Sequence, residues 1–498
     1  MPLQPPSLFE IFFKKGIKMP KSLYVKRLVK FVSSTVMLVM VNTSFAEQPV
    51  LLTADELKQI ESIRDDSLKS NLGYQILESL TTEVGARMAG TPQDTLAVNW
   101  AVEKLKSLDF DKVWTEPVTY TTWKRGVETA EILSPYPQAL HITALGDSVS
   151  TKKGGVIAKL VHFRNLEELI TAKPADVKDK IVFISHRMER FRNGQGYGIA
   201  VKARRDGAAE AAKKGALAIL IRSIGTDDHR MPHTGMMKYQ KEINKIPAAA
   251  LSNPDADQLE RIFKRGTDIS IKVNIGAQPA GEFTSHNVIG EITGSVNPKE
   301  KIIMGGHLDS WDLGTGAVDD GAGVSITMAA AALIKQSGVK TRRSIRVILW
   351  ANEEQGLKGA KAYAAAHKND LEQHIIGAES DFGAGKIYEF SSLVTKKDQP
   401  FIDQMEKIFL PLGIKKGNNK AGPGPDLIPL YEKGMSVFRL AQDGTDYFDL
   451  HHTADDTLDK VDPEAIAQNV AAYTVYALMM AQYQSDLARP IEENNDEH

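Results

Sequence analysis

Cysteine is absent from all 498 residues of the chain. Its absence excludes disulfides, thiolate metal sites and a cysteine nucleophile, so any metal must be held by His, Asp and Glu. An excess of one charge is also lacking, since the formal net charge is −2. Neither nucleic acid nor an anionic membrane is therefore an expected partner. The length, with 42% hydrophobic residues, predicts two or three domains with buried cores.

The N-terminus has the pattern of an export signal. From Met19 the chain runs through a basic region and an apolar run at residues 31–41 to small residues ending at Ala46. This order predicts a signal peptide at residues 19–46, cleaved after about Ala46, and hence a periplasmic protein. The apolar run is shorter than the roughly 20 residues that span a bilayer, so an uncleaved anchor is the weaker alternative. We expect no stable membrane anchor after cleavage.

Strands and helices alternate along the rest of the chain. Residues 146–282 combine short apolar strands with a small-residue helix at 200–215, which predicts a compact α/β insert. From residue 287, apolar strands such as 344–351 alternate with helices such as 321–336. This alternation predicts a doubly wound, mostly parallel α/β sheet in a catalytic domain formed by residues 50–145 and 283–490.

Five polar clusters follow predicted strands, where open α/β sheets place their sites. They are Gly306-His307-Leu308-Asp309-Ser310, Asp319-Asp320-Gly321, Glu353-Glu354, Glu379-Ser380-Asp381 and His451-His452-Thr453. Together they hold imidazoles and carboxylates for a two-zinc hydrolytic site, with one carboxylate to spare as a base.

Each cluster alone has a plainer interpretation. The two glutamates fit a solvated charge pair, and the two histidines fit a surface pair. Asp319-Asp320-Gly321 fits a turn that caps the next helix. His307 and Asp309 fit a hydrogen-bonded core pair, although a carboxylate behind a histidine also orients metal ligands. The common position of all five clusters at strand ends favours a shared site.

The motifs around these clusters resemble, in order, those of the di-zinc aminopeptidase and glutamate carboxypeptidase family. They read Gly-His-Leu-Asp-Ser-Trp-Asp, Gly-Ala-Val-Asp-Asp-Gly-Ala-Gly, Trp-Ala-Asn-Glu-Glu-Gln-Gly, Glu-Ser-Asp-Phe-Gly and His-His-Thr-Ala-Asp-Asp-Thr. The resemblance implies the zinc exopeptidase fold, and residues 146–282 resemble the protease-associated domain inserted in several exopeptidases. The family resemblance extends over nearly the whole chain after the signal peptide.

The resemblance also implies roles for single residues. Asp319 matches the carboxylate that bridges two Zn²⁺ ions. The remaining ligands are His307 and Asp381 for one ion, and Glu354 and His452 for the other. Glu353 matches the general base and Asp309 the partner of His307. Asp319 and His452 are preferred over Asp320 and His451 because the residues after them keep the family spacing.

The family pattern leaves the oxyanion donor open. Some members have a tyrosine just before the last histidine ligand, where this chain has His451, so His451 and Tyr447 are both candidates for an oxyanion or substrate contact. The resemblance implies an exopeptidase that cleaves dipeptides or short peptides, as well as a homodimer. Two alternatives are a catalytically inactive peptide-binding protein of the same fold and an acyltransferase like the single-zinc glutaminyl cyclases.

Overall fold

The structure is a computed structural model that describes residues 50–485 and 487. The predicted signal peptide at residues 19–46 and the last residues of the predicted catalytic domain, 488–490, lie outside the described residues. The described residues belong to one compact unit, and this unit contains two eight-stranded sheets. We refer to them as the catalytic sheet and the insert sheet.

The catalytic sheet has the strand order β1-β10-β12-β11-β13-β16-β14-β15. Its strands are β1 (Lys112–Lys124), β10 (Gln278–Ile292), β11 (Asn297–His307), β12 (Arg343–Trp350), β13 (His374–Glu379), β14 (Ile387–Ser392), β15 (Lys415–Lys416) and β16 (Ser436–Gln442). The central strands β12, β11, β13 and β16 are parallel. The pairs β1–β10, β10–β12 and β14–β16 are antiparallel. The predicted parallel sheet thus exists at the centre, whereas the whole sheet is mixed.

Helices cover both faces of this sheet. Long helices such as α8 (Ala322–Gln336) and α13 (Pro463–Gln482) pack on one face together with α1 (Ala54–Lys69), α2 (Leu72–Glu83) and α3 (Pro92–Ser107). The other face carries α9 (Lys358–Ala366) and α11 (Ile428–Tyr431), and α10 (Gln399–Phe409) packs against α13. With helices on both faces, β12 is buried along its whole length, and its second half, from Val347 to Trp350, is entirely apolar.

Two local signals explain the N-terminal helices. Thr53 and Glu56 form a reciprocal capping box at the start of α1. The helical spacing of residues 54–80 would fit one helix, but the segment forms two, because Ser70 adopts an extended backbone and ends α1 before α2 begins at Leu72. Periodicity alone did not reveal this break, since the apolar spacing continues across it.

The insert sheet has the order β3-β2-β9-β5-β6-β7-β8-β4. Its strands are β2 (Glu128–Ser134), β3 (Gln138–Leu140), β4 (Ile142–Ala144), β5 (Val156–Phe163), β6 (Ile181–Ile184), β7 (Ala218–Arg222), β8 (Ala248–Leu251) and β9 (Ser270–Ile275). Its helices are α4 (Leu166–Thr171), α5 (Pro174–Val177), α6 (Gln195–Lys213) and α7 (Asn253–Phe263). An α/β insert therefore exists as a structure.

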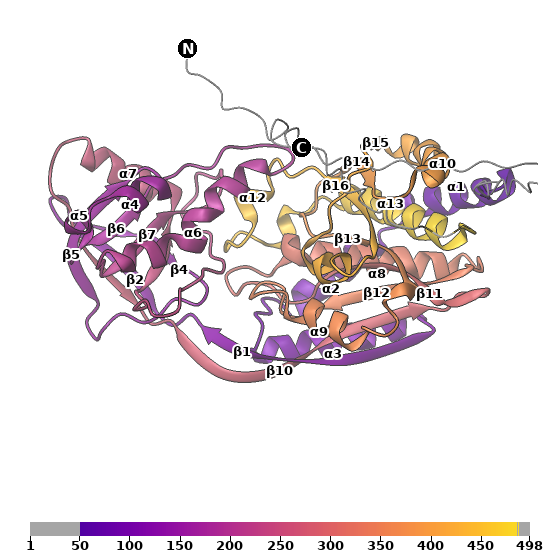
Figure 1. Cartoon of the computed structure of the whole chain (residues 1–498), viewed down its shortest axis with the longest axis horizontal. Helices are drawn as coiled ribbons and strands as arrows, with labels where there is room; N and C mark the ends of the chain where they lie inside the picture. Colours follow the sequence, from indigo (N-terminus) through magenta and orange to yellow (C-terminus); the bar gives the residue numbers. More distant parts are fainter. Residues whose placement is uncertain (1–49, 486, 488–498) are drawn as a thin grey trace, which may run out of the picture. The chain divides into compact units, whose positions relative to one another are not determined.

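The chain enters and leaves the insert through one ribbon. Figure 1 shows β1 and β10 running side by side, and their pairing continues to Lys124 opposite Gln278. Sheet membership consequently changes near residues 125 and 277, earlier than the predicted limits at 146 and 282. The short strands β2 to β4 carry few strand signals, so the sequence placed them in the catalytic domain.

Within the described residues, one helical stretch is long and apolar enough to cross a membrane, Ala317–Gln336, and 94% of its apolar window is buried inside the protein. It contains α8, which packs against α13 and β11. Its apolar character is explained by this central position in the core.

A buried histidine in the catalytic domain gives a pH-dependent stability. His374 lies between the Tyr363 hydroxyl and the Asp370 carbonyl. Burial, then the charges of Lys301 and Arg346, lower its pKa to about 3. The unfolded chain binds a proton near pH 6.5, so between these values the unfolded state holds more protons and stability falls as the pH falls.

We therefore expect His374 to cost about 2 kcal/mol of unfolding free energy between pH 7 and pH 5. Urea unfolding of the wild type and of His374→Gln at both pH values measures this contribution. The variant should lose less stability on acidification than the wild type. Equal losses in the two proteins would show that His374 takes up its proton in the folded state.

Candidate active site

Four of the five clusters meet at the carboxyl ends of the central parallel strands. His307 is the last residue of β11, the two glutamates follow β12, and Asp381 follows β13. Asp319 lies in the turn Ala317–Gly321 that leads into α8. The histidine pair, on the loop after β16, follows the short helix α12 (Tyr447–Leu450). The structure thus brings together the residues that the motifs singled out.

Asp319 is at the centre of this arrangement. Its Oδ1 lies 3.1 Å from Nε2 of His307, which is also 3.7 Å from Oδ1 of Asp381. Its Oδ2 lies 3.1 Å from Nε2 of His452, which is 2.9 Å from Oε2 of Glu354. We call these sets the His307 group (His307, Asp381 and Oδ1 of Asp319) and the His452 group (His452, Glu354 and Oδ2 of Asp319).

Asp320, the residue after Asp319, makes hydrogen bonds to the backbone instead. Oδ2 of Asp320 accepts the backbone N–H of His307, and Oδ1 accepts that of Gly323, each at 3.0 Å. Both oxygens are therefore committed to holding β11 against the start of α8. Although His307, Asp320 and Asp381 lie close enough to share an ion, these bonds favour Asp319 as the metal-facing residue.

Asp309 contacts His307 differently from the prediction. The backbone carbonyl of Asp309 lies 2.9 Å from Nδ1 of His307, whereas its carboxylate is 3.8 Å away. Oδ1 of that carboxylate instead accepts the backbone N–H of Glu353 at 3.0 Å. Asp309 thus orients the imidazole through its main chain and positions the glutamate pair through its side chain.

The donor atoms fit zinc. Oδ2 of Asp319 and Oε1 of Glu354 are buried without a hydrogen-bond partner in the described part of the chain. Buried carboxylate oxygens normally have a partner, so these two atoms are suited to binding a cation. Imidazole and carboxylate are the zinc ligands open to a chain without cysteine.

The carboxylates also crowd one another. Burial raises the pKa of Asp309 to about 7 and that of Asp381 to about 6. Burial, together with the charges of Asp381, Glu354 and Asp309, raises the pKa of Glu353 well above its ordinary range against the opposing effect of His307. Asp319 is the exception, since nearby imidazoles outweigh burial and lower its pKa. Added positive charge would stabilise this cluster in its ionised form.

Both groups face a pocket of about 670 Å³. The catalytic domain supplies Glu353, Glu354, Tyr447 and His451 to its wall, and the insert supplies side chains from α6 and from residues 236–238. The His451 ring stacks on His452 with centroids 3.6 Å apart, and its Nδ1 is buried without a hydrogen-bond partner among the described residues. The pocket has a size typical of small-molecule sites.

The sequence did not single out three residues that hold this site. Asp456 accepts the backbone N–H groups of Val318 and Asp319 at 2.6 and 3.2 Å. Trp311 donates its indole N–H to Oε2 of Glu354 at 2.5 Å. Asp456 stands in the motif of His451 and Trp311 in the motif of His307. These motifs were the signal that could have revealed the two residues. The third, His233, belongs to the insert and stands in no motif.

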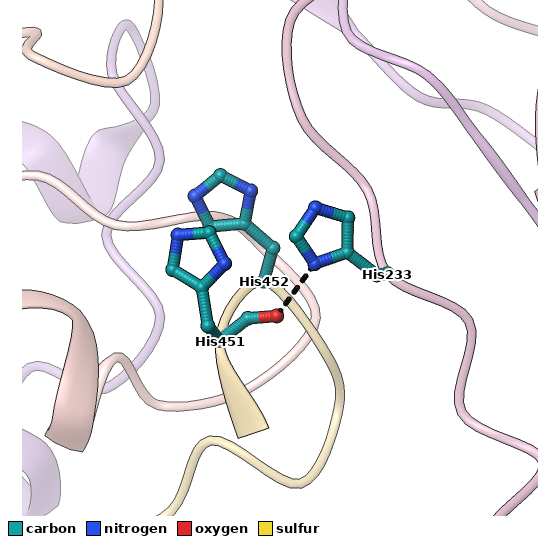
Figure 2. A group of neighbouring side chains, drawn as sticks. All are labelled: His233, His451 and His452. Carbon is teal, nitrogen blue, oxygen red and sulfur yellow. Dashed lines mark hydrogen bonds between the residues drawn. The ribbon is translucent and has the colours of Figure 1, made fainter. Parts of the chain in front are cut away.

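His233 lies beside the histidine pair, as Figure 2 shows. Its Nδ1 is 2.8 Å from the carbonyl of His451, and its Nε2 is 2.7 Å from a guanidinium nitrogen of Arg204. Arginine only donates, so Nε2 accepts and Nδ1 carries the proton. Although His233, His451 and His452 could together surround an ion, His233 has no lone pair left for a metal.

Comparison with known proteins identifies the family. The model of peptidase family M28 matches residues 287–477. Carboxypeptidase Q of Bos taurus is 33% identical over 435 residues, which cover 87% of this chain and 90% of the relative. The chain belongs to peptidase family M28.

Solved structures of M28 peptidases agree with this assignment. A peptidase M28 precursor from Shewanella amazonensis SB2B is 51% identical, covers 88% of this chain and 99% of its own, and superimposes with a TM-score of 0.86. A zinc aminopeptidase from Bacillus subtilis shares the fold, at 20% identity, a TM-score of 0.58 and coverage of 84% and 98%. The chain is accordingly a metallo-exopeptidase of family M28, related to carboxypeptidase Q.

Proposed function

We propose that this M28 peptidase is an exported two-zinc exopeptidase that hydrolyses dipeptides or short peptides. One observation carries the proposal: the two oxygens of Asp319 each face an imidazole and a second carboxylate beside the same pocket. A single carboxylate between two such sets fits a ligand shared by two ions.

In this proposal the His307 group holds one zinc ion and the His452 group holds the other. Zinc in such sites supplies Lewis acidity that activates water and polarises a carbonyl. Each ion would have three protein ligands, which would leave room for water or substrate. Trp311 and the Asp309 carbonyl hold Glu354 and His307 in place, as neighbours of metal ligands commonly do.

Glu353 is proposed as the general base. Its side chain reaches the pocket next to that of Glu354, and its backbone is fixed by Asp309. It would take the proton from the attacking water and deliver it to the leaving amine. His451, whose Nδ1 has no hydrogen-bond partner among the described residues, and Tyr447 line the same pocket and are the proposed substrate or oxyanion contacts.

Positive charges in the pocket wall support a substrate with a free carboxylate. Five basic residues from the two domains line the pocket: Arg204, Arg205, Lys238, Lys358 and Lys361. A peptide carboxylate near the scissile bond would be attracted to them. A dipeptide fulfils this requirement, because its terminal carboxylate belongs to the residue directly after its single peptide bond.

Turnover of a dipeptide panel by the purified protein tests the proposal. Activity should be lost on chelation and restored by added zinc, and dipeptides amidated at the C-terminus should be cleaved more slowly than free ones. A protein that binds two zinc ions without cleaving any peptide would favour the binding-protein alternative. Binding of a single zinc ion would favour the cyclase-like acyltransferase.

The proposal also includes export to the periplasm and assembly into a homodimer. The pattern of residues 19–46 supports export to the periplasm. Sequencing the N-terminus of the protein recovered from a periplasmic fraction should place the first residue just after about Ala46, and retention of the pattern in the mature protein would contradict export by cleavage. Sedimentation of the same sample would decide whether the protein is the homodimer that the family resemblance implies.

A further inference from the structure

The two metal groups differ in what supports them. Nδ1 of His307 is held by the carbonyl of Asp309, two residues further along the same loop. Nδ1 of His452 lies 3.3 Å from the carbonyl of Thr234, a residue of the insert. A histidine that offers Nε2 to a metal carries its proton on Nδ1, so in the metal-binding form His452 donates to Thr234. One group is thus supported within the catalytic domain and the other from the insert.

The insert also holds the backbone of the histidine pair. The N–H of Thr234 donates to the carbonyl of His452 at 3.0 Å, and His233 donates to that of His451 at 2.8 Å. His452 has a φ of +61°, in the left-handed region that side chains other than glycine seldom adopt. Such a conformation persists where its surroundings fix it. The loop of Thr234 supplies these bonds.

Close packing makes this contact rigid. A Cβ at Gly235 would lie 2.1 Å from a guanidinium nitrogen of Arg204 and 2.9 Å from Nδ1 of His452. Arg204 in turn donates to His233 at 2.7 Å and to the Thr234 carbonyl at 3.2 Å. The insert loop therefore lies directly against the imidazole of His452.

A second route reaches Glu354 through Trp311. The indole donates to Oε2 of Glu354, and a Cβ at Gly146 of the insert would lie 2.4 Å from the ring. The next residue, Asp312, forms an ion pair at 2.6 Å with Arg125, which also donates to the Ala144 carbonyl of the insert at 2.6 Å. The position of Trp311, and with it Glu354, thus depends on how the insert docks.

We propose that the insert is a positioning element for one of the two metals: its residues hold His452 and Glu354 in ligand geometry, while the His307 group is independent of it. His233 and Trp311 are the positioning residues through which it acts. This inference rests on the proposed two-zinc site. It assigns the insert a part in building that site, beyond covering the pocket.

Zinc affinities measured by competition with a chromophoric chelator test the inference. His233→Ala and Trp311→Phe should each weaken one zinc about 10- to 100-fold and leave the other unchanged. Trp311→Phe keeps an aromatic ring at this buried position but removes the indole N–H together with the five-membered ring, so its effect is compared with that of Trp114→Phe. In an Asp381→Asn background, which disables the His307 group, Trp311→Phe should weaken the remaining tight zinc.

Matched controls separate positioning from a loss of stability. Trp114→Phe removes an indole N–H that donates to Glu116 at 3.0 Å, away from the pocket. His141→Ala removes a half-exposed histidine of the insert that is paired with Asp255. Both controls should bind two zinc ions as the wild type does.

Three outcomes decide the matter. Selective weakening of one zinc in His233→Ala and Trp311→Phe supports the inference. Unchanged affinities, or equal weakening of both ions, would overturn it while leaving the two-zinc site intact. A wild type that binds fewer than two zinc ions would instead contradict the proposed function, and the inference would fall with it.

Discussion

Glu353→Gln should lower dipeptide turnover by about 10²- to 10⁴-fold while the amount of bound zinc stays that of the wild type. The substitution keeps the size of the side chain and the backbone N–H that donates to Asp309. It removes only the group that accepts a proton from water. Glu354, the neighbouring residue in the His452 group, is unchanged, so the metal ligands remain complete.

Steady-state rates and elemental analysis of the same preparation measure this effect. Glu353→Ala should behave alike, which would show that the loss does not come from the new amide. Glu432→Gln, a substitution at an exposed carboxylate after α11, is the matched control and should keep full activity. Substantial turnover by Glu353→Gln would rule out Glu353 as the base.

Asp319→Ala should reduce bound zinc from about two ions per chain to well under one, with loss of activity. Both oxygens of this carboxylate take part in the site, one in each group. A substitution here therefore damages both groups at once. Asp381→Ala, by contrast, removes a ligand from the His307 group alone and should leave about one ion tightly bound.

Elemental analysis after gel filtration separates these results. Asp403→Ala, which removes a surface carboxylate paired with Lys416, should retain the full zinc content. Near-normal zinc in Asp319→Ala would show that the two ions do not share this ligand. Equal losses in Asp319→Ala and Asp381→Ala would indicate that binding of the two ions is coupled.

Much of the catalytic domain could be predicted because strong local signals coincide with its elements. The apolar run that forms β12 and the Pro463 start of α13 are examples. The antiparallel β1–β10 pair could not be predicted, since it joins segments on either side of the insert. β14 and β16 are harder to predict, because these short strands are separated by α10 and by irregular turns.

The residues of the candidate site could be singled out because the motifs place them after strands, and the ends of parallel strands lie at the same edge of a sheet. The roles that main-chain atoms have in the site could not be predicted from the sequence. Asp309 lies near His307 as expected, but its carbonyl makes the closer contact. The contribution of the insert was equally hidden, because Thr234 acts through its backbone and His233 lies more than 200 residues before the loop that it holds.

The paired ends of the β1–β10 ribbon bear on how such enzymes diversify. Lys124 and Gln278 are partners in neighbouring strands, about 4.8 Å apart. A hairpin turn of two to five residues could therefore replace everything between them without disturbing the catalytic sheet. A lineage that gained or lost the intervening sequence would need only one local change in the sheet. It would also need a new hydrogen-bond partner for His452 elsewhere in the protein.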